Sequence, residues 1–165
     1  MTRREFEVTD PAVIRDILEE SKVLRLGLVD DGMPYVVPMN YGYRLEDGVL
    51  TLYLHSAVKG YKLDVIAKNP TCCFEMDCRV EPFEGKIPCQ YGITYYSLMG
   101  RGKAVLVEDP AEKELAMTLL MKAQTGKDFE FNERLVSIVS VIRIEVSTYT
   151  AKHRPLPGQE PNQKS

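Results

Sequence analysis

The sequence contains no tryptophan and no long apolar run, and its two signs of charge nearly balance. A membrane-spanning helix needs about 20 consecutive apolar residues. No segment approaches that length, so a membrane partner is not expected. Residues 1–7 include basic side chains, but no apolar run follows them, which argues against a secretory signal and favours a cytoplasmic location. With 21 basic and 24 acidic residues and a pI of about 5.5, the chain lacks the basic excess typical of a protein whose main partner is nucleic acid.

Cysteine is scarce, and its spacing does not fit a zinc site. Cys72, Cys73, Cys78 and Cys89 form no C-x-x-C pair, and both histidines are distant from them in the sequence. The cytosol keeps thiols reduced, which predicts four free thiols. The glycine-rich phosphate loop, the H-E-x-x-H helix and the G-x-S-x-G elbow are also absent. A hydrolase or a metalloenzyme would therefore have to be assembled from scattered residues.

Alternation of apolar and polar residues indicates one β-rich domain over residues 1–152. A chain of 165 residues with 44% hydrophobic side chains suits a single core. Asp31-Gly32 and Asp47-Gly48 predict tight hairpin turns. Six antiparallel strands with three peripheral helices imply a barrel or closed sheet of the α+β class, followed by a flexible tail over residues 153–165. The predicted strands cover residues 23–29, 35–44, 49–55, 71–78, 91–107 and 136–148, with helices beginning near residues 11, 60 and 110 and a polar loop over residues 81–88.

The run from Leu54 to Asp64 offers the clearest chemistry, because it joins a strand end to a helix start. A helix N-terminus presents free backbone N–H groups and the positive end of the helix dipole, which suits a phosphate. Ser56 supplies a hydroxyl and Lys62 a charged donor, and His55 precedes the hydroxyl. A plainer interpretation stays open, in which Ser56 only caps the helix, the lysines are solvated and His55 is a structural residue.

Two further runs have the composition of a wall for a planar ligand. Residues 34–43 read as a strand that contains Pro38, which indicates an edge or a bulge where backbone groups are free for a ligand. Residues 89–104 are rich in tyrosine, and Gly100 and Gly102 suggest a bulge or a close backbone approach. The tyrosines either pack a barrel or wall a ring-shaped ligand, and the sequence supports both interpretations.

Together and in this order, the runs resemble the FMN-binding split-barrel proteins related to pyridoxamine 5′-phosphate oxidase, in particular the branch linked to nitroimidazole resistance. The resemblance covers residues 3–152. It implies a six-stranded antiparallel split β-barrel of the Greek-key type, and a homodimer that holds FMN in a groove at the subunit interface. The motifs that carry it are Gly27-Leu28-Val29, Asp31-Gly32, Pro34-Tyr35-Val36-Val37-Pro38, Leu54-His55-Ser56-Ala57, Gly60, Lys62-Leu63, Cys89, Tyr91, Tyr95, Ser97 and Gly100-x-Gly102-Lys103-Ala104.

The resemblance also implies a set of site residues. Ser56 and Lys62 match residues that hold the FMN phosphate, and His55 matches a histidine that lies near the flavin and is linked to reduction of nitro compounds. The substrate-phosphate residues of the true oxidases have no strong match, so that activity is not carried over. The remaining cofactor-binding residues are Val37, Pro38, Met39 and Asn40 along the ring, Tyr96 and Ser97 from the long strand, and Lys152 at the end of the last strand.

The sequence therefore predicts a cytoplasmic, dimeric FMN flavoprotein that acts on a small molecule. We expect an oxidoreductase that passes electrons from a reduced nicotinamide or another donor to a small organic acceptor such as a nitro compound, with the redox chemistry supplied by the flavin. Two alternatives stay open. One is a flavin-binding redox module without turnover, and the other is the same barrel binding haem or a deazaflavin.

Overall fold

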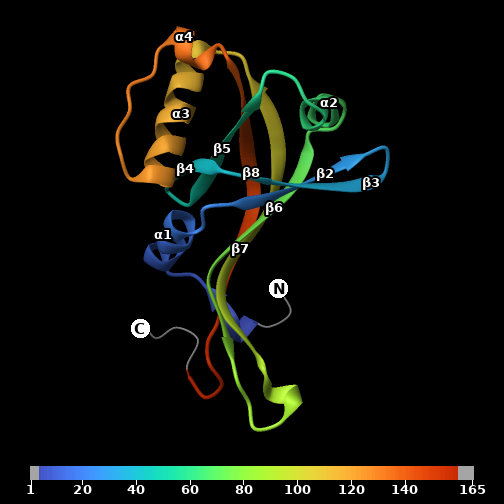
Figure 1. The fold of residues 1–165 in the computed structure, drawn as a ribbon, viewed down its shortest axis with the longest axis vertical. Coiled ribbons are helices and arrows are strands. Elements are labelled where there is room, and N and C mark those ends of the chain that lie inside the picture. The colour runs from blue at the N-terminus through green and yellow to red at the C-terminus, as the bar shows by residue number, and fades with distance from the viewer. Residues whose placement is uncertain (1–3, 160–165) are drawn as a thin grey trace.

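A single curved antiparallel sheet forms the centre of the protein (Figure 1). The computed structural model describes residues 4–159. The strands are β1 (Glu7–Val8), β2 (Leu24–Asp30), β3 (Met33–Met39), β4 (Tyr41–Glu46), β5 (Val49–Ala57), β6 (Thr71–Phe83), β7 (Gly92–Val107) and β8 (Val139–Arg154). Seven of them follow the order β3-β2-β6-β7-β8-β5-β4, and β1 pairs with β8. The mainly antiparallel β prediction is confirmed, but these residues form eight strands rather than six, and the barrel is not closed.

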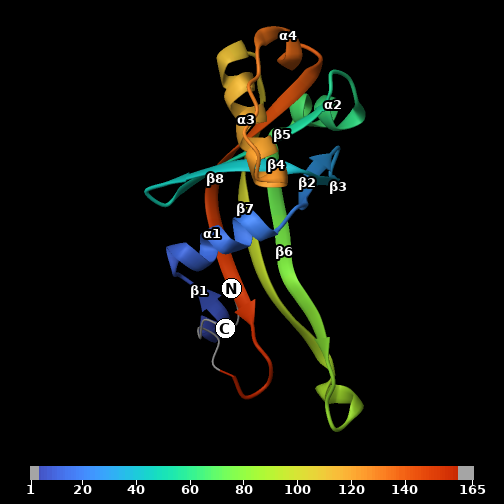
Figure 2. The ribbon, with the colours of Figure 1, turned by 60° about the vertical axis from the view of Figure 1, so that its left-hand side comes forward.

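Helices lie around the sheet; α1, α2 and α3 begin where the sequence predicts, whereas η1, η2 and α4 were not predicted. The helices are η1 (Arg4–Phe6), α1 (Pro11–Glu20), α2 (Tyr61–Lys68), η2 (Pro88–Gln90), α3 (Pro110–Thr125) and α4 (Glu133–Val136). Asp10 accepts a hydrogen bond from the Ala12 N–H at 2.8 Å, and Asp109 accepts one from the Glu112 N–H at 2.8 Å. A proline follows each of these caps, as is common at the first helical position. Figure 2 shows α3 and α4 at one end of the sheet and α1 near its middle.

Two aspartate–glycine turns fold the first half of the sheet into hairpins. Asp31 and Gly32 have φ values of 48° and 86° and join β2 to β3. Asp47 and Gly48 have φ values of 49° and 79° and join β4 to β5. Positive φ at both central residues is the turn geometry whose twist matches that of paired strands. Both predicted hairpins are confirmed.

The chain leaves one strand and enters another at Asn40, where the sequence predicts a single strand over residues 35–44. That prediction is wrong, because β3 pairs with β2 and β4 pairs with β5, at opposite edges of the sheet. The Asn40 side chain holds this corner by donating from Nδ2 to the Lys22 carbonyl and to Gln124 Oε1, both at 3.1 Å. The barrel is open because the two edge strands do not pair with each other. Pro38 lies in an edge strand, as predicted.

The hairpin of β6 and β7 extends away from the body of the protein as an arm (Figure 1). A bulge between Cys78 and Glu81 interrupts the pairing of β6, and Arg79 within it has a φ of 50°. Beyond the bulge β6 continues to Phe83, so the polar loop predicted over residues 81–88 is shorter than expected. The boundary predicted at residue 152 falls inside β8, and residues 160–165 of the expected tail lie outside the described residues.

The last strand begins three residues later than predicted. Alternation over residues 136–148 predicts Val136 and Ile138 in a strand, but Val136 ends α4 and Ile138 is 72% exposed. Asn132 explains the difference, because its Oδ1 accepts a hydrogen bond from the Leu135 N–H at 3.0 Å and caps a short helix there. The helix cap at Asn132 thus sets the conformation of residues 133–136, although the alternation of apolar residues predicts a strand from residue 136.

Two apolar clusters lie on opposite faces of the sheet. The larger cluster fills the concave side and includes Leu26, Leu52 and Phe74, and we call this side the inner face. The smaller cluster lies between the sheet and helices α3 and α4 and includes Tyr53 and Val141, and we call this side the outer face. The outer face is thus covered by helices over β5 and the adjoining end of β8.

Three chemical features of residues 4–159 bear on function. No helix in this range is long and apolar enough to span a membrane. No group of three or more histidine, cysteine, aspartate or glutamate side chains in the range is placed to hold a metal ion. The four cysteines are free thiols, with Cys72 buried and Cys73 exposed on the opposite face of β6, as the strand periodicity predicts.

Candidate functional site

The strand register divides the predicted site residues between the two faces of the sheet. Residues paired directly across an antiparallel ladder lie on the same face, and the faces alternate along each strand. Pairs lead from Pro38 through Arg25 and Glu75 to Met99 in β7, and this row belongs to the outer face. The predicted residues on the outer face are Pro38, His55, Ser97 and Lys152, and those on the inner face are Val37, Met39, Ser56 and Tyr96.

A groove composed of two adjoining hollows runs along the outer face. The larger hollow has a volume of about 1040 Å³ and the smaller one about 710 Å³. Ser97 and Lys152 line the smaller hollow, and within residues 4–159 none of the other predicted site residues lines either one. Four residues, Gly27, Val36, Cys73 and Arg101, belong to both hollows. None of these four is among the predicted site residues, because only the strand register reveals that they share a face.

The larger hollow ends at a compact ion-pair network beside α3. Arg143 donates from Nη1 to both carboxylate oxygens of Glu112, at 2.6 and 2.8 Å, and from Nη2 to Glu145 at 2.7 Å. The Tyr53 hydroxyl lies 3.4 Å from Glu112. Burial, together with the charge of Glu112, raises the pKa of Tyr53 above its usual value of 10.0. The single positive charge of Arg143 is therefore shared between two carboxylates.

The smaller hollow contains a second ion-pair group and, outside that group, the cations Lys152 and Arg101. Arg25 pairs with Asp77 and lies 3.1 Å from Glu75, whose pKa is raised by burial and by the neighbouring Asp77. Lys152 Nζ lies 5.4 Å from the ring centroid of Tyr95 and 5.7 Å from that of Phe6, a cation–π arrangement. Among the described residues Lys152 forms no ion pair with a carboxylate, so its charge is available to a ligand in the hollow.

His55 and Ser56 lie near the end of β5, with side chains on opposite faces of the sheet, and Lys62 lies in the first turn of α2. His55 Nδ1 is buried and has no hydrogen-bond partner within residues 4–159. Burial, and after it the positive charge of Lys62, lowers the pKa of His55 below 6.5, so the imidazole is uncharged at neutral pH. Ser56 Oγ donates to the Ala57 carbonyl at 2.9 Å. The site therefore combines a half-buried cation, a neutral imidazole with an unused nitrogen and a helix start.

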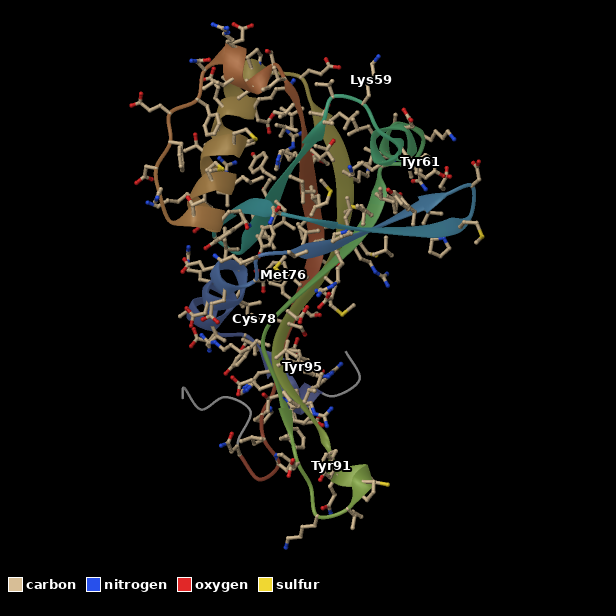
Figure 3. All side chains as sticks on the ribbon, in the orientation of Figure 1. Lys59, Tyr61, Met76, Cys78, Tyr91 and Tyr95 are labelled. Atoms are coloured by element: carbon tan, nitrogen blue, oxygen red, sulfur yellow. The ribbon has the colours of Figure 1, made fainter. Side chains whose placement is uncertain are left out.

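The two sets of predicted residues lie far apart within one chain. His55 pairs with Val141 near the start of β8, and Ser97 pairs with Lys152 near its end. Eleven residues separate these pairs, which corresponds to about 35 Å along the strand. In Figure 3, Lys59 and Tyr61 mark the upper set beside α2, whereas Tyr95 marks the lower set. A single chain cannot bring both sets to the same small ligand.

Three of the predicted ring-lining residues are engaged inside the chain. Tyr96 stacks on His153 with centroids 3.9 Å apart and planes 6° from parallel, and the Arg79 guanidinium lies 5.0 Å from the Tyr96 ring centroid. Met39 is 8% exposed in the larger core cluster. The Asn40 amide makes the two corner hydrogen bonds already described. The exposed surface beside these residues is formed by Pro38 and Val36 instead.

A family model described as pyridoxamine 5′-phosphate oxidase matches residues 10–153, which is most of the chain. No curated protein matches the chain. The resemblance found in the sequence is therefore confirmed at the level of the family. The match spans both predicted sets of site residues, from Val37 to Lys152.

Solved structures with a similar fold include one with substantial sequence identity. A proposed 5-nitroimidazole antibiotic resistance protein from Bacteroides thetaiotaomicron is 32% identical, with 89% of this chain and 86% of that chain covered and a TM-score of 0.75. An FAD- and haem-binding protein from Mycobacterium smegmatis is 16% identical, with coverages of 97% and 77% and a TM-score of 0.74. The flavocytochrome Anf3 from Azotobacter vinelandii is also 16% identical, with coverages of 91% and 70% and a TM-score of 0.72. The last two similarities concern the fold alone.

Proposed function

The chain belongs to the pyridoxamine 5′-phosphate oxidase family, and on that premise we propose that it is an FMN-binding oxidoreductase. It passes electrons from a reduced donor to a small organic acceptor, and the relative with 32% identity supports a nitro compound as that acceptor. The flavin, when bound, supplies the electron and hydride chemistry, while the protein binds and orients it.

The unpartnered Nδ1 of His55 beside Lys62 is the observation that carries this proposal. A buried polar atom without a hydrogen bond costs about 1–3 kcal/mol, so such an atom in a native protein calls for a ligand or an ordered water. The positive charge of Lys62 favours an anionic group at the same place. Ser56, Lys62 and the first-turn N–H groups of α2 fit a phosphate monoester, which accepts hydrogen bonds from hydroxyl, ammonium and amide donors.

His55 is uncharged at neutral pH and can form hydrogen bonds to a ligand in that state. Its lowered pKa keeps the imidazole neutral at neutral pH, so one ring nitrogen donates and the other accepts. The protein can therefore hold a single proton next to the ligand without adding a second positive charge to that of Lys62. Ser56 Oγ has to leave the Ala57 carbonyl before it can donate to a phosphate, whereas its lone pairs accept without any change.

A homodimer follows from the distance between the two sets of predicted residues. Because Ser97 and Lys152 lie about 35 Å along β8 from the row of His55, one FMN meets both sets only if a second copy supplies one of them. The groove also exposes apolar side chains, a pattern typical of interaction surfaces. These side chains are Val29, Val36, Val49 and Met99, which are 40–65% exposed.

An absorption spectrum of the purified protein tests the cofactor directly. The proposal expects flavin bands that persist through gel filtration, and FMN rather than FAD on release by heat. A Soret band would instead identify haem and refute the flavin assignment. Steady-state oxidation of a reduced nicotinamide with a nitro acceptor tests turnover, and bound flavin without turnover would reduce the protein to a redox module. Sedimentation equilibrium that gives a monomer of 18.7 kDa with FMN still bound would rule out the shared site.

A further inference from the structure

Three cations of the groove form no ion pair within residues 4–159, and two of them share one strand. Arg101 and Lys103 lie two residues apart on the outer face of β7, and both line the larger hollow. Within residues 4–159 neither forms an ion pair. Glu145 lies directly opposite Lys103 in the ladder but bonds to Arg143 at 2.7 Å instead. Glu112 and Glu145 share the single positive charge of Arg143, so the carboxylate opposite Lys103 is only partly neutralised.

The backbone that carries the two cations is fixed by a bulge. Arg101 pairs with Thr148 whereas Gly102 pairs with Val146, so Ser147 is an extra residue in β8. Ser147 Oγ donates to the Arg101 carbonyl at 3.0 Å and closes the bulge. A Cβ at Gly102 would lie 2.2 Å from the Glu145 carbonyl oxygen, so the close approach requires glycine. Bulges often aim side chains at a functional site, and this one fixes the direction of Arg101 and Lys103.

The groove lining has more basic than acidic side chains although the protein is acidic. Two of these basic residues are paired outside the lining, Arg44 with Glu46 and Arg25 with Asp77. The lining of the two hollows contains six basic and only three acidic side chains, while the whole chain has a net charge of −3. A concave surface with an excess of one charge concentrates ligands of the opposite charge. The six basic residues are Arg25, Arg44, Arg101, Lys103, Arg143 and Lys152.

We propose that Arg101 and Lys103 form a second anion subsite, separate from the site at His55 and Lys62, which binds the diphosphate of a dinucleotide. The two side chains present a planar guanidinium and an ammonium two residues apart on one strand. A diphosphate suits this pair, because its two charged groups accept several charge-assisted hydrogen bonds. The diphosphate belongs either to a nicotinamide dinucleotide that donates electrons or to FAD. Binding of the anion stands on the groove alone, whereas its assignment to an electron donor rests on the proposed flavin function.

Calorimetric titration of the full-length protein with inorganic pyrophosphate tests the subsite. We expect wild-type protein to bind it with an affinity that falls as salt is added, because surface charges are screened. The double variant Arg101→Gln/Lys103→Gln should bind about 10- to 100-fold more weakly, as expected for two lost charge-assisted hydrogen bonds in a half-open groove. The matched control Arg134→Gln/Lys127→Gln removes the same charges outside the groove and should bind like wild type.

Further measurements identify the source of the diphosphate. If FAD supplies it, wild type binds FAD more tightly than FMN, and the double variant loses that preference. If the donor supplies it, the KM for NADH or NADPH rises in the double variant while FMN affinity is unchanged. The exchanged variant Arg101→Lys/Lys103→Arg keeps both charges and should retain pyrophosphate binding, which separates charge from folding.

Four results would overturn the subsite. The first is that wild type does not bind pyrophosphate, and the second is that the double variant binds it as tightly as wild type. The third is that the double variant shifts from dimer to monomer in sedimentation velocity. The fourth is that the double variant loses affinity for FMN but not for riboflavin. The third result would mean that the two cations pair with a second copy. The fourth would mean that they hold the phosphate of FMN itself, a failure distinct from the absence of flavin binding by wild type.

Discussion

Removal of the Lys62 ammonium group by Lys62→Ala should weaken FMN binding by about 10- to 150-fold and leave riboflavin binding nearly unchanged. Lys62 is half-buried in the first turn of α2, and its charge contributes to the lowered pKa of His55. A hydrogen bond to a charged group contributes about 1.5–3 kcal/mol, and each ~1.4 kcal/mol changes a dissociation constant tenfold. Riboflavin lacks the phosphate and therefore lacks this contact.

Quenching of flavin fluorescence, measured for both ligands in wild type and variant, gives the double difference. Lys68→Ala is a matched control at the other end of α2, where Lys68 lies 3.7 Å from Asp30, and it should leave both affinities unchanged. An NMR titration of the unliganded variant should also show the pKa of His55 moving back towards 6.5, because the charge is removed while burial persists. Equal weakening of FMN and riboflavin, or no weakening, would place the phosphate elsewhere and refute the reasoning.

Three other perturbations test separate parts of the structure. The pKa of His55 lies below the 6.5 of an unperturbed histidine, so as the pH falls through 6.5 the unfolded chain takes up a proton before the folded protein does. The free energy of unfolding of wild type should therefore decline in this pH range, and that of His55→Gln should change less. Urea titration at several pH values measures both. Iodoacetamide should modify Cys73 and Cys89 but not Cys72, because burial raises the pKa of the Cys72 thiol to about 11, and mass spectrometry detects the modified residues. Bound FMN should protect Cys73, which lines the groove, but not Cys89, which lies on the arm. Gly42→Ala should cost about 1–3 kcal/mol and lower the Tm by roughly 2–12 °C, since overpacking strains a close contact. A Cβ there would lie 2.3 Å from the Leu120 backbone nitrogen, and an unchanged Tm would show that α3 can move away.

Structural features that depend on a few adjacent residues were predictable from the sequence. The two aspartate–glycine hairpins and the capped starts of α1 and α3 follow from backbone conformations and side-chain acceptors that are local to each motif. The placement of His55 and Ser56 near a strand end and of Lys62 at a helix start is equally local, because the three residues lie within eight positions of the sequence. Local chemistry was sufficient for these elements.

Features that depend on distant partners were not predictable. The break at Asn40 follows from hydrogen bonds to Lys22 and Gln124, and the latter is 84 residues away. The groove was missed for a similar reason, because Arg101 and Cys73 share a face only through the pairing of β6 with β7. Motif order could suggest that Ser97 joins the site of His55, but only the register of β8 reveals the distance between them.

The edge of the sheet formed by β3 has a consequence for behaviour at high concentration. An unpaired edge normally offers a row of N–H and C=O groups to which another chain can add a strand, which leads to aggregation. Pro34, Val36 and Pro38 alternate along β3, so their backbone nitrogens all point away from β2 towards the open side. Proline has no N–H, and two of these three donors are therefore missing. An approaching strand would find acceptors without matching donors, which lets the barrel stay open without promoting fibre growth along this edge.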